Sequence, residues 1–182
     1  MNSTRLALNA TIALSLFAFT PACSRKQDPR QLYEQGKAEL AKGDTAKAKE
    51  LFKRSVTIEP KIADAQYRLG SLLLKEDKAK EALPHLEAAA MQKPRTATFQ
   101  FRLGEAYLKV HDNELAINAL KTAMEVDPKM GGPYVKLAKA YRRAGREADA
   151  TAIIAKGLEA VPKSDGFYPE LEGARDAGAS AN

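Results

Sequence analysis

Proline recurs at a fixed interval along this chain, and that interval constrains the fold more than any other feature of the sequence. Pro60, Pro94, Pro128 and Pro162 follow one another at steps of 34 residues. Other columns keep the same step: Gly36, Gly70, Gly104 and Ala138; Ala48, Ala82, Ala116 and Ala150; Phe52, Leu86, Leu120 and Ile154. Four columns in phase over four units indicate an array of similar structural units.

Each unit has the pattern of two amphipathic helices. In the second unit, residues 65–75 carry leucines at helical spacing, and residues 79–91 do the same after a break at Asp77. The closing proline cannot continue the helix before it, so it predicts a turn into the next unit. Gly43, His111 and Gly145 stand at the other breaks, where a helix end often requires a left-handed residue.

The columns of small residues predict a close approach of the two helices within each unit. One column lies on the first helix of every pair and the alanine column lies on the second. Large side chains there would push the two helix axes apart, beyond the usual range of about 8 to 10 Å.

These motifs resemble the tetratricopeptide repeat, whose pattern is an aromatic, then L-G, a tyrosine, A-x₃-F and a closing proline. The fourth unit is most similar, with Tyr134, Leu137, Ala138, Tyr141, Ala150, Ile154 and Pro162. Gln66 and Gln100 replace the leading aromatic in the second and third units. The resemblance implies an all-α, right-handed α-solenoid with units at 29–60, 63–94, 97–128 and 131–162.

Both ends of the array depart from the pattern. Gln35 and Glu39 take the place of apolar residues in the first unit, as suits a terminal unit whose outer face meets water. At the other end, residues 163–182 predict a short cap helix near Pro169 to Arg175, followed by a disordered tail. Such a thin cap would leave apolar surface exposed, where a partner or a second copy could bind.

The first 22 residues predict a signal peptide. One cation in MNSTR precedes an apolar run from Leu6 to Phe19, which is shorter than a membrane-spanning helix. Cys23, the single cysteine, follows directly, and this arrangement resembles the lipobox of bacterial lipoproteins. Residues 23–28 would then form a lipidated N-terminus and linker. Thr20 stands where lipoboxes have Leu, Val or Ile, so cleavage after Ala22 to release a free secreted protein remains an alternative.

The resemblance to lipoproteins also predicts a location. Their lipidated cysteine holds the protein at the bacterial cell envelope, with the folded part in the periplasm. Ser24 follows the cysteine, and a residue other than Asp at that position favours the outer membrane over the inner one. We therefore expect a contact with the membrane through the N-terminal lipid.

Several function classes are not expected. The net charge of +6 is modest and its cations are dispersed, so nucleic acid is not an expected partner. The two histidines, His85 and His111, have no further ligand at metal spacing, and no catalytic or phosphate-binding motif is present. We expect no enzyme activity, metal, cofactor or small-molecule substrate.

By resemblance, a protein partner would bind the concave groove lined by the first helices. The residues expected there are Tyr33, Tyr67, Phe101, Val135, Leu74, Leu108, Arg68, Arg102, Lys136, Lys75, Lys109, Arg142 and Arg143. They describe an apolar ladder bordered by cations, which suits a segment with apolar anchors and acidic flanks. The resulting hypothesis is a lipid-anchored scaffold for a cell-envelope complex such as a secretin, pilus or cell-wall machinery. The alternatives are a self-associating structural protein and a free periplasmic adaptor.

Overall fold

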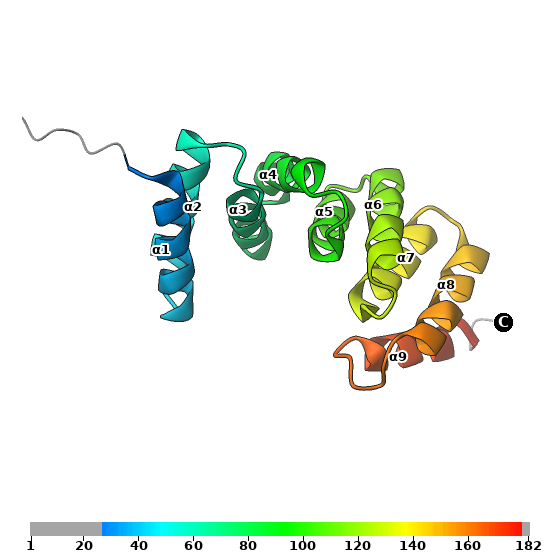
Figure 1. Cartoon of the computed structure of the whole chain (residues 1–182). Helices are drawn as coiled ribbons and strands as arrows, with labels where there is room; N and C mark the ends of the chain where they lie inside the picture. The colour runs from blue at the N-terminus through cyan, green and yellow to red at the C-terminus, as the bar shows by residue number, and fades with distance from the viewer. Residues whose placement is uncertain (1–26, 180–182) are drawn as a thin grey trace, which may run out of the picture.

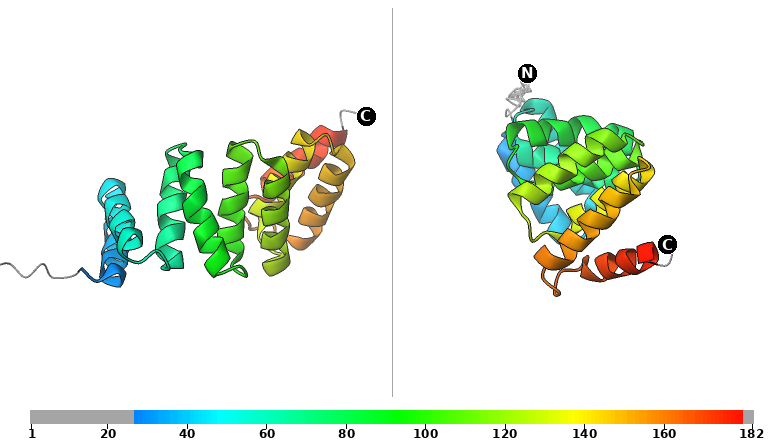
Figure 2. Two further views of the ribbon diagram at one scale, coloured as in Figure 1. Left: turned by 90° about the horizontal axis from the view of Figure 1, so that it is seen from above. Right: turned by 90° about the vertical axis from the view of Figure 1, so that its right-hand side faces the viewer.

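The computed structural model describes residues 27–179, in which all regular structure is α-helical. The helices are α1 (Pro29–Ala41), α2 (Thr45–Ile58), α3 (Ala63–Lys75), α4 (Ala79–Gln92), α5 (Ala97–Lys109), α6 (Asn113–Val126), α7 (Gly131–Arg143), α8 (Glu147–Ala160) and α9 (Tyr168–Ala179). The first eight form four antiparallel pairs that stack in chain order into an arch (Figure 1). The view from above shows successive pairs side by side along one axis (Figure 2). The predicted right-handed α-solenoid of four pairs with a C-terminal helix is confirmed.

The four repeated prolines occupy equivalent corners of the stack. Each lies two residues beyond the end of a second helix, as Pro60 does after Ile58 and Pro94 after Gln92. The left-handed residues expected at the turns within the pairs are also present: φ is +87° at Gly43, +61° at Asp77, +66° at His111 and +72° at Gly145. Turn chemistry therefore repeats with the same period as the helices.

Close packing within each pair depends on the small-residue columns. A Cβ added to Gly36 would lie 2.6 Å from Phe52 Cε1, and one added to Gly104 would lie 2.6 Å from Leu120 Cγ. The alanines of the second helices are fully buried in all four units. No side chain larger than that of glycine fits between these helices without displacing a buried neighbour.

The glutamines that replace the leading aromatic residue make the same hydrogen bond as the tyrosine in the fourth unit. Tyr134 donates its hydroxyl to the carbonyl of Pro128 at 2.9 Å. Gln66 and Gln100 donate their side-chain amides to the carbonyls of Pro60 and Pro94, each at 3.0 Å. In every case the donor lies six residues after the proline and fixes the corner between two units.

The first unit ends in a polar face, as expected of a cap. Gln35 is exposed, and the half-buried Glu39 forms ion pairs with Lys42 at 3.1 Å and Lys47 at 3.3 Å. These pairs lower the pKa of Glu39, chiefly through hydrogen bonds from the two ammonium groups. Water and surface lysines thus take the place of a preceding unit.

The C-terminal helix covers the last unit more completely than the sequence suggested. α9 runs from Tyr168 to Ala179, beyond the predicted end near Arg175, because this stretch is rich in alanine, the best helix former. Leu171 is fully buried against α7 and α8. The exposed apolar end that was expected after the fourth unit is therefore largely absent from residues 27–179.

The predictions for the N-terminal segment concern residues that lie outside the described part of the chain. This holds for the signal peptide, Cys23 and most of the linker, and for the last three residues of the predicted tail. Within residues 27–179, no helix combines the length and apolar character needed to cross a membrane.

Candidate partner-binding groove

Charge is segregated between the two layers of the solenoid. In units two to four, the first helices carry eight cations and two acids, namely Arg68, Lys75, Arg102, Lys109, Lys136, Lys139, Arg142 and Arg143 against Asp64 and Glu105. The second helices carry three cations and seven acids, namely Lys80, Lys121 and Lys156 against Glu81, Glu87, Glu114, Glu125, Glu147, Asp149 and Glu159. Opposite faces of the same units thus have opposite net charge.

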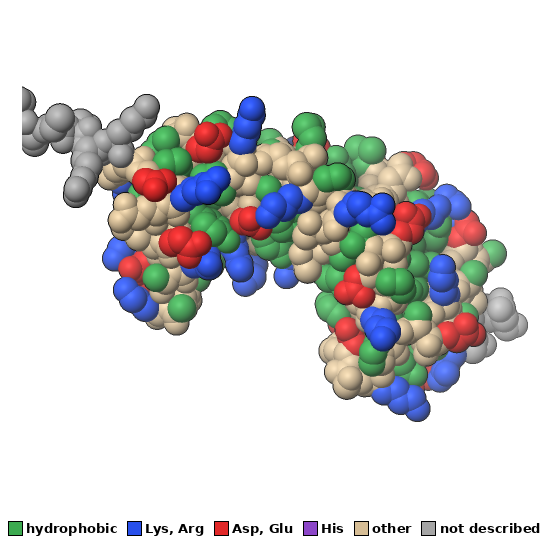
Figure 3. All heavy atoms as spheres, viewed as in Figure 1, with side chains coloured by type: hydrophobic (Ala, Val, Ile, Leu, Met, Phe, Trp, Pro, Cys, Tyr) green, Lys and Arg blue, Asp and Glu red, His purple; other side chains and the backbone are tan. Residues whose placement is uncertain are grey.

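The hollowed side of the arch carries part of this cationic layer. Figure 3 shows the underside hollowed between the first unit and the C-terminal end, with Lys and Arg side chains projecting beneath the middle units. A cavity of about 430 Å³ opens between α5 and α7. Lys109, Lys136, Lys139 and Arg143 line it together with Glu105, His111 and Leu108. This cavity is the most cationic recess among the described residues.

Only part of the predicted apolar ladder is accessible. Tyr33, Tyr67 and Val135 are half-buried and reach the surface. Leu74, Phe101 and Leu108 are buried, with 7%, 4% and 5% of their surface exposed. These three were expected to face a ligand, but here they pack within the solenoid because neighbouring first helices lie close enough to cover them.

Two aromatic residues that the groove prediction omitted account for much of this packing. Phe167, from the segment before α9, packs edge-on against Phe101 with ring centroids 6.2 Å apart. Gly132 makes room for this pair, since a Cβ there would lie 2.7 Å from the Phe101 ring. Phe99 stacks on Tyr67 with centroids 4.5 Å apart and planes inclined by 17°. The C-terminal segment of the chain therefore fills the groove end beside α5 and α7.

Several of the predicted groove cations are held by acids from the same or the next unit. Arg102 lies 2.5 Å from Glu105, and Lys136 lies 3.9 Å from the same carboxylate. Lys109 pairs with Asp77 at 2.5 Å, and its hydrogen bond lowers the pKa of that carboxyl.

The other groove cations differ in how they are held. Arg142 pairs with Glu147 at 3.0 Å, and Arg143 donates to the carbonyl of Leu108 at 2.6 Å. Arg68 and Lys75 are exposed and form no ion pair with another residue in 27–179. The unneutralised charge therefore lies on α3 and around the cavity between α5 and α7.

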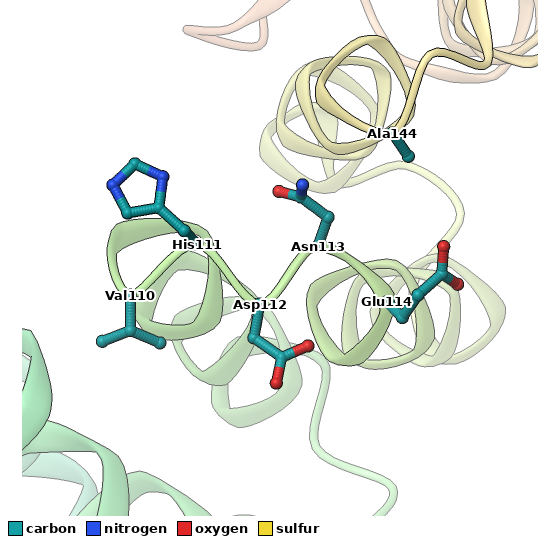
Figure 4. Close-up of a pocket in the computed structure, with 6 residues that line it drawn as sticks. All are labelled: Val110, His111, Asp112, Asn113, Glu114 and Ala144. Atoms are coloured by element: carbon teal, nitrogen blue, oxygen red, sulfur yellow. The ribbon is translucent and has the colours of Figure 1, made fainter.

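The described residues show no convergent catalytic or metal-binding group. No cluster of three or more His, Cys, Asp or Glu side chains is arranged to hold a metal ion in this part of the chain. A shallow cavity of about 560 Å³ at the turn between α5 and α6 contains His111, Asp112, Asn113 and Glu114. Figure 4 shows these side chains pointing away from one another, so they do not converge on a ligand.

A protein-family model for the tetratricopeptide repeat matches residues 39–100 and 107–167, more than half of the chain. The chain belongs to the tetratricopeptide repeat family. The family assignment made from the repeat motifs is therefore confirmed. Its repeats and solenoid fold support a protein-interaction scaffold, since members are in general non-catalytic modules that bind other proteins.

Solved structures of the protein MamA share this architecture. The chain is 32% identical to MamA residues 41 to the end from Desulfovibrio magneticus RS-1, with a TM-score of 0.67 over 74% of this chain and 76% of that one. A double mutant of RS-1 MamA is 30% identical, with a TM-score of 0.67 over 84% and 80% of the two chains. MamA of MSR-1 is 26% identical, with a TM-score of 0.66 over 73% and 76%. No curated protein matches the chain.

Proposed function

We propose that this protein is a lipid-anchored scaffold of the bacterial cell envelope, which binds an acidic segment of another envelope protein along its concave face. The partner would be a component of an assembly such as a secretin, a pilus or the cell-wall machinery. The segregation of charge between the first and second helices supports the proposal most strongly. An acidic polypeptide is attracted to one face of units two to four and repelled by the other.

The accessible part of the groove suits an extended or helical segment. Tyr67 offers an apolar surface beside the exposed Arg68 and Lys75, and the cationic cavity follows two helices further along. A partner with one or two apolar anchors and flanking carboxylates would bury the aromatic surface while meeting the cations.

Affinity capture from native membranes with a charge-reversed groove tests the proposal. The variant Lys136→Glu with Lys139→Glu changes the cavity, and the matched control, Lys121→Glu with Lys156→Glu, makes the same charge change on α6 and α8. The account expects the groove variant to lose an envelope partner that the wild type and the control both retain. Retention by the groove variant and loss by the control would move the interface to the second helices.

The lipid anchor has its own experiment. Two or more acyl chains hold a protein stably at a membrane, whereas one alone is marginal. Cys23→Ala is therefore expected to shift the protein from the membrane fraction to the soluble periplasmic fraction. Retention on membranes would indicate an uncleaved apolar segment, and a soluble wild type would indicate the free periplasmic adaptor.

A further inference from the structure

Tyrosine side chains fill the space between the second helices at two of the three unit junctions. Tyr107 packs into both main core clusters and donates its hydroxyl to Glu87 at 2.7 Å. Burial and that carboxylate raise its pKa to about 12. Tyr141, 34 residues later, is buried with Lys121 5.8 Å from its ring centroid. Each ring thus reaches the same column of the preceding second helix, which holds Glu87 in one unit and Lys121 in the next.

The remaining junction, between units one and two, lacks such a ring. Leu73 occupies the tyrosine column there, and its shorter side chain does not span the gap. A cavity of about 550 Å³ results, with Val56, Leu69 and Leu73 among its apolar lining residues. A leucine in place of a tyrosine accounts for the position of the cavity and for its apolar floor.

The rim of this cavity is polar and mainly basic. Lys49, Lys53 and Lys78 line it together with Glu50, Glu81 and the half-buried His85. Lys49 and Lys78 both bond to Glu76 just outside, whereas Lys53 forms no ion pair with another residue in 27–179. Lys53 belongs to the column of Glu87 and Lys121, the column that the tyrosine rings reach at the other junctions.

The surrounding surface also differs from the later second helices. α2 carries four cations and one acid, namely Lys47, Lys49, Lys53 and Arg54 against Glu50, whereas α4, α6 and α8 are net acidic. A segment that docks beside α2 is therefore favoured if it is acidic.

We propose that this cavity binds the tyrosine side chain of an acidic segment from a partner polypeptide. The ring takes the place that Tyr107 and Tyr141 fill from within the chain at the other junctions. Its hydroxyl oxygen accepts a hydrogen bond from the Lys53 ammonium, where Glu87 instead accepts one from Tyr107. Carboxylates on either side of the tyrosine meet the cations of α2. This site lies on the second helices and is separate from the concave groove.

Methyl NMR with a short peptide probe tests the site directly. The probe is the acetylated pentapeptide Asp-Glu-Tyr-Glu-Asp, compared with the same peptide in which alanine replaces tyrosine. We expect saturable shifts of the Val56, Leu69 and Leu73 methyl groups with the tyrosine peptide, and at least ten-fold weaker binding of the alanine peptide. Absence of saturable shifts at millimolar peptide, or equal binding of both peptides, would overturn the proposal.

Two variants separate this site from the groove. Leu73→Tyr fills the cavity from within, and we expect it to abolish the shifts of Val56 and Leu69 and to raise the melting temperature. Lys53→Glu leaves the core intact and is expected to weaken the tyrosine peptide at least five-fold, whereas Lys121→Glu, in the same column, leaves it unchanged. Binding that survives Lys53→Glu but is lost in Lys139→Glu would place the peptide in the groove and refute this site.

Discussion

The contact between Gly104 and Leu120 gives a prediction in which two effects of known size oppose each other. Replacing a helical glycine with alanine favours folding by about 1 kcal/mol through helix propensity alone. In Gly104→Ala, however, the new Cβ would lie 2.6 Å from Leu120 Cγ, and Leu120 is fully buried, so its branch point has nowhere to move. Overpacking of this kind costs about 1–3 kcal/mol, so a net loss of about 1 kcal/mol is expected.

The assay for this prediction is urea denaturation followed by far-UV circular dichroism. A loss of about 1 kcal/mol corresponds to a fall of about 3 °C in melting temperature for a domain of this size. Gly173→Ala is the matched control, because a Cβ at that helical position meets no atom within 4 Å. The control should become more stable, by up to about 1 kcal/mol.

A double-mutant cycle completes the test. Leu120→Ala alone should cost about 2–5 kcal/mol by leaving a cavity in the core. The same change in the Gly104→Ala background should cost about 1 kcal/mol less, because the added methyl group occupies part of that space. Stabilisation by Gly104→Ala equal to that of Gly173→Ala, or additive effects in the cycle, would refute the close-packing argument.

Three further perturbations have defined outcomes. Tyr134→Phe leaves the Pro128 carbonyl without its hydroxyl donor and should cost about 1 kcal/mol in urea denaturation; an unchanged stability would show that the corner does not need this bond. Burial lowers the pKa of His85 below 6.5, so its contribution to stability is present above that pH and is lost as the pH falls through the folded-state pKa. The melting temperature of the wild type should therefore fall more between pH 7 and pH 5 than that of His85→Leu, and parallel curves would contradict this assignment. His111→Gly relieves a left-handed backbone and should stabilise the fold by about 0.5–1 kcal/mol, whereas a loss would mean that the side chain makes a contact that offsets the strain.

The architecture could be predicted from the sequence because its determinants are local and repeated. The prolines, the left-handed turn residues and the small columns each act within one unit, so their spacing alone fixes where helices end and which faces meet. The substitution of glutamine for an aromatic residue could not be interpreted in the same way. Only the structure shows that Gln66 and Gln100 keep the hydrogen bond that Tyr134 makes to a proline carbonyl.

The groove was harder to predict because it depends on contacts between units. Phe101 looked accessible from its column, but a residue 66 positions later, Phe167, covers it. One pattern could have indicated this: Leu171 lies 34 residues after Leu137, so the C-terminal segment continues the repeat as an additional first helix. The cations were easier to place, since a charged side chain on an exposed helical face stays accessible whatever the packing beneath it.

Site-specific photo-cross-linking in living cells tests the central claim most directly. A photoreactive residue is introduced at Lys139 on the cationic face or at Lys121 on the opposite face, and cross-linked products are identified by mass spectrometry. We predict that position 139 captures an envelope protein through an acidic segment, that position 121 does not, and that Lys136→Glu removes the product. Capture of the same partner from position 121 alone, with none from position 139, would contradict binding through the concave face.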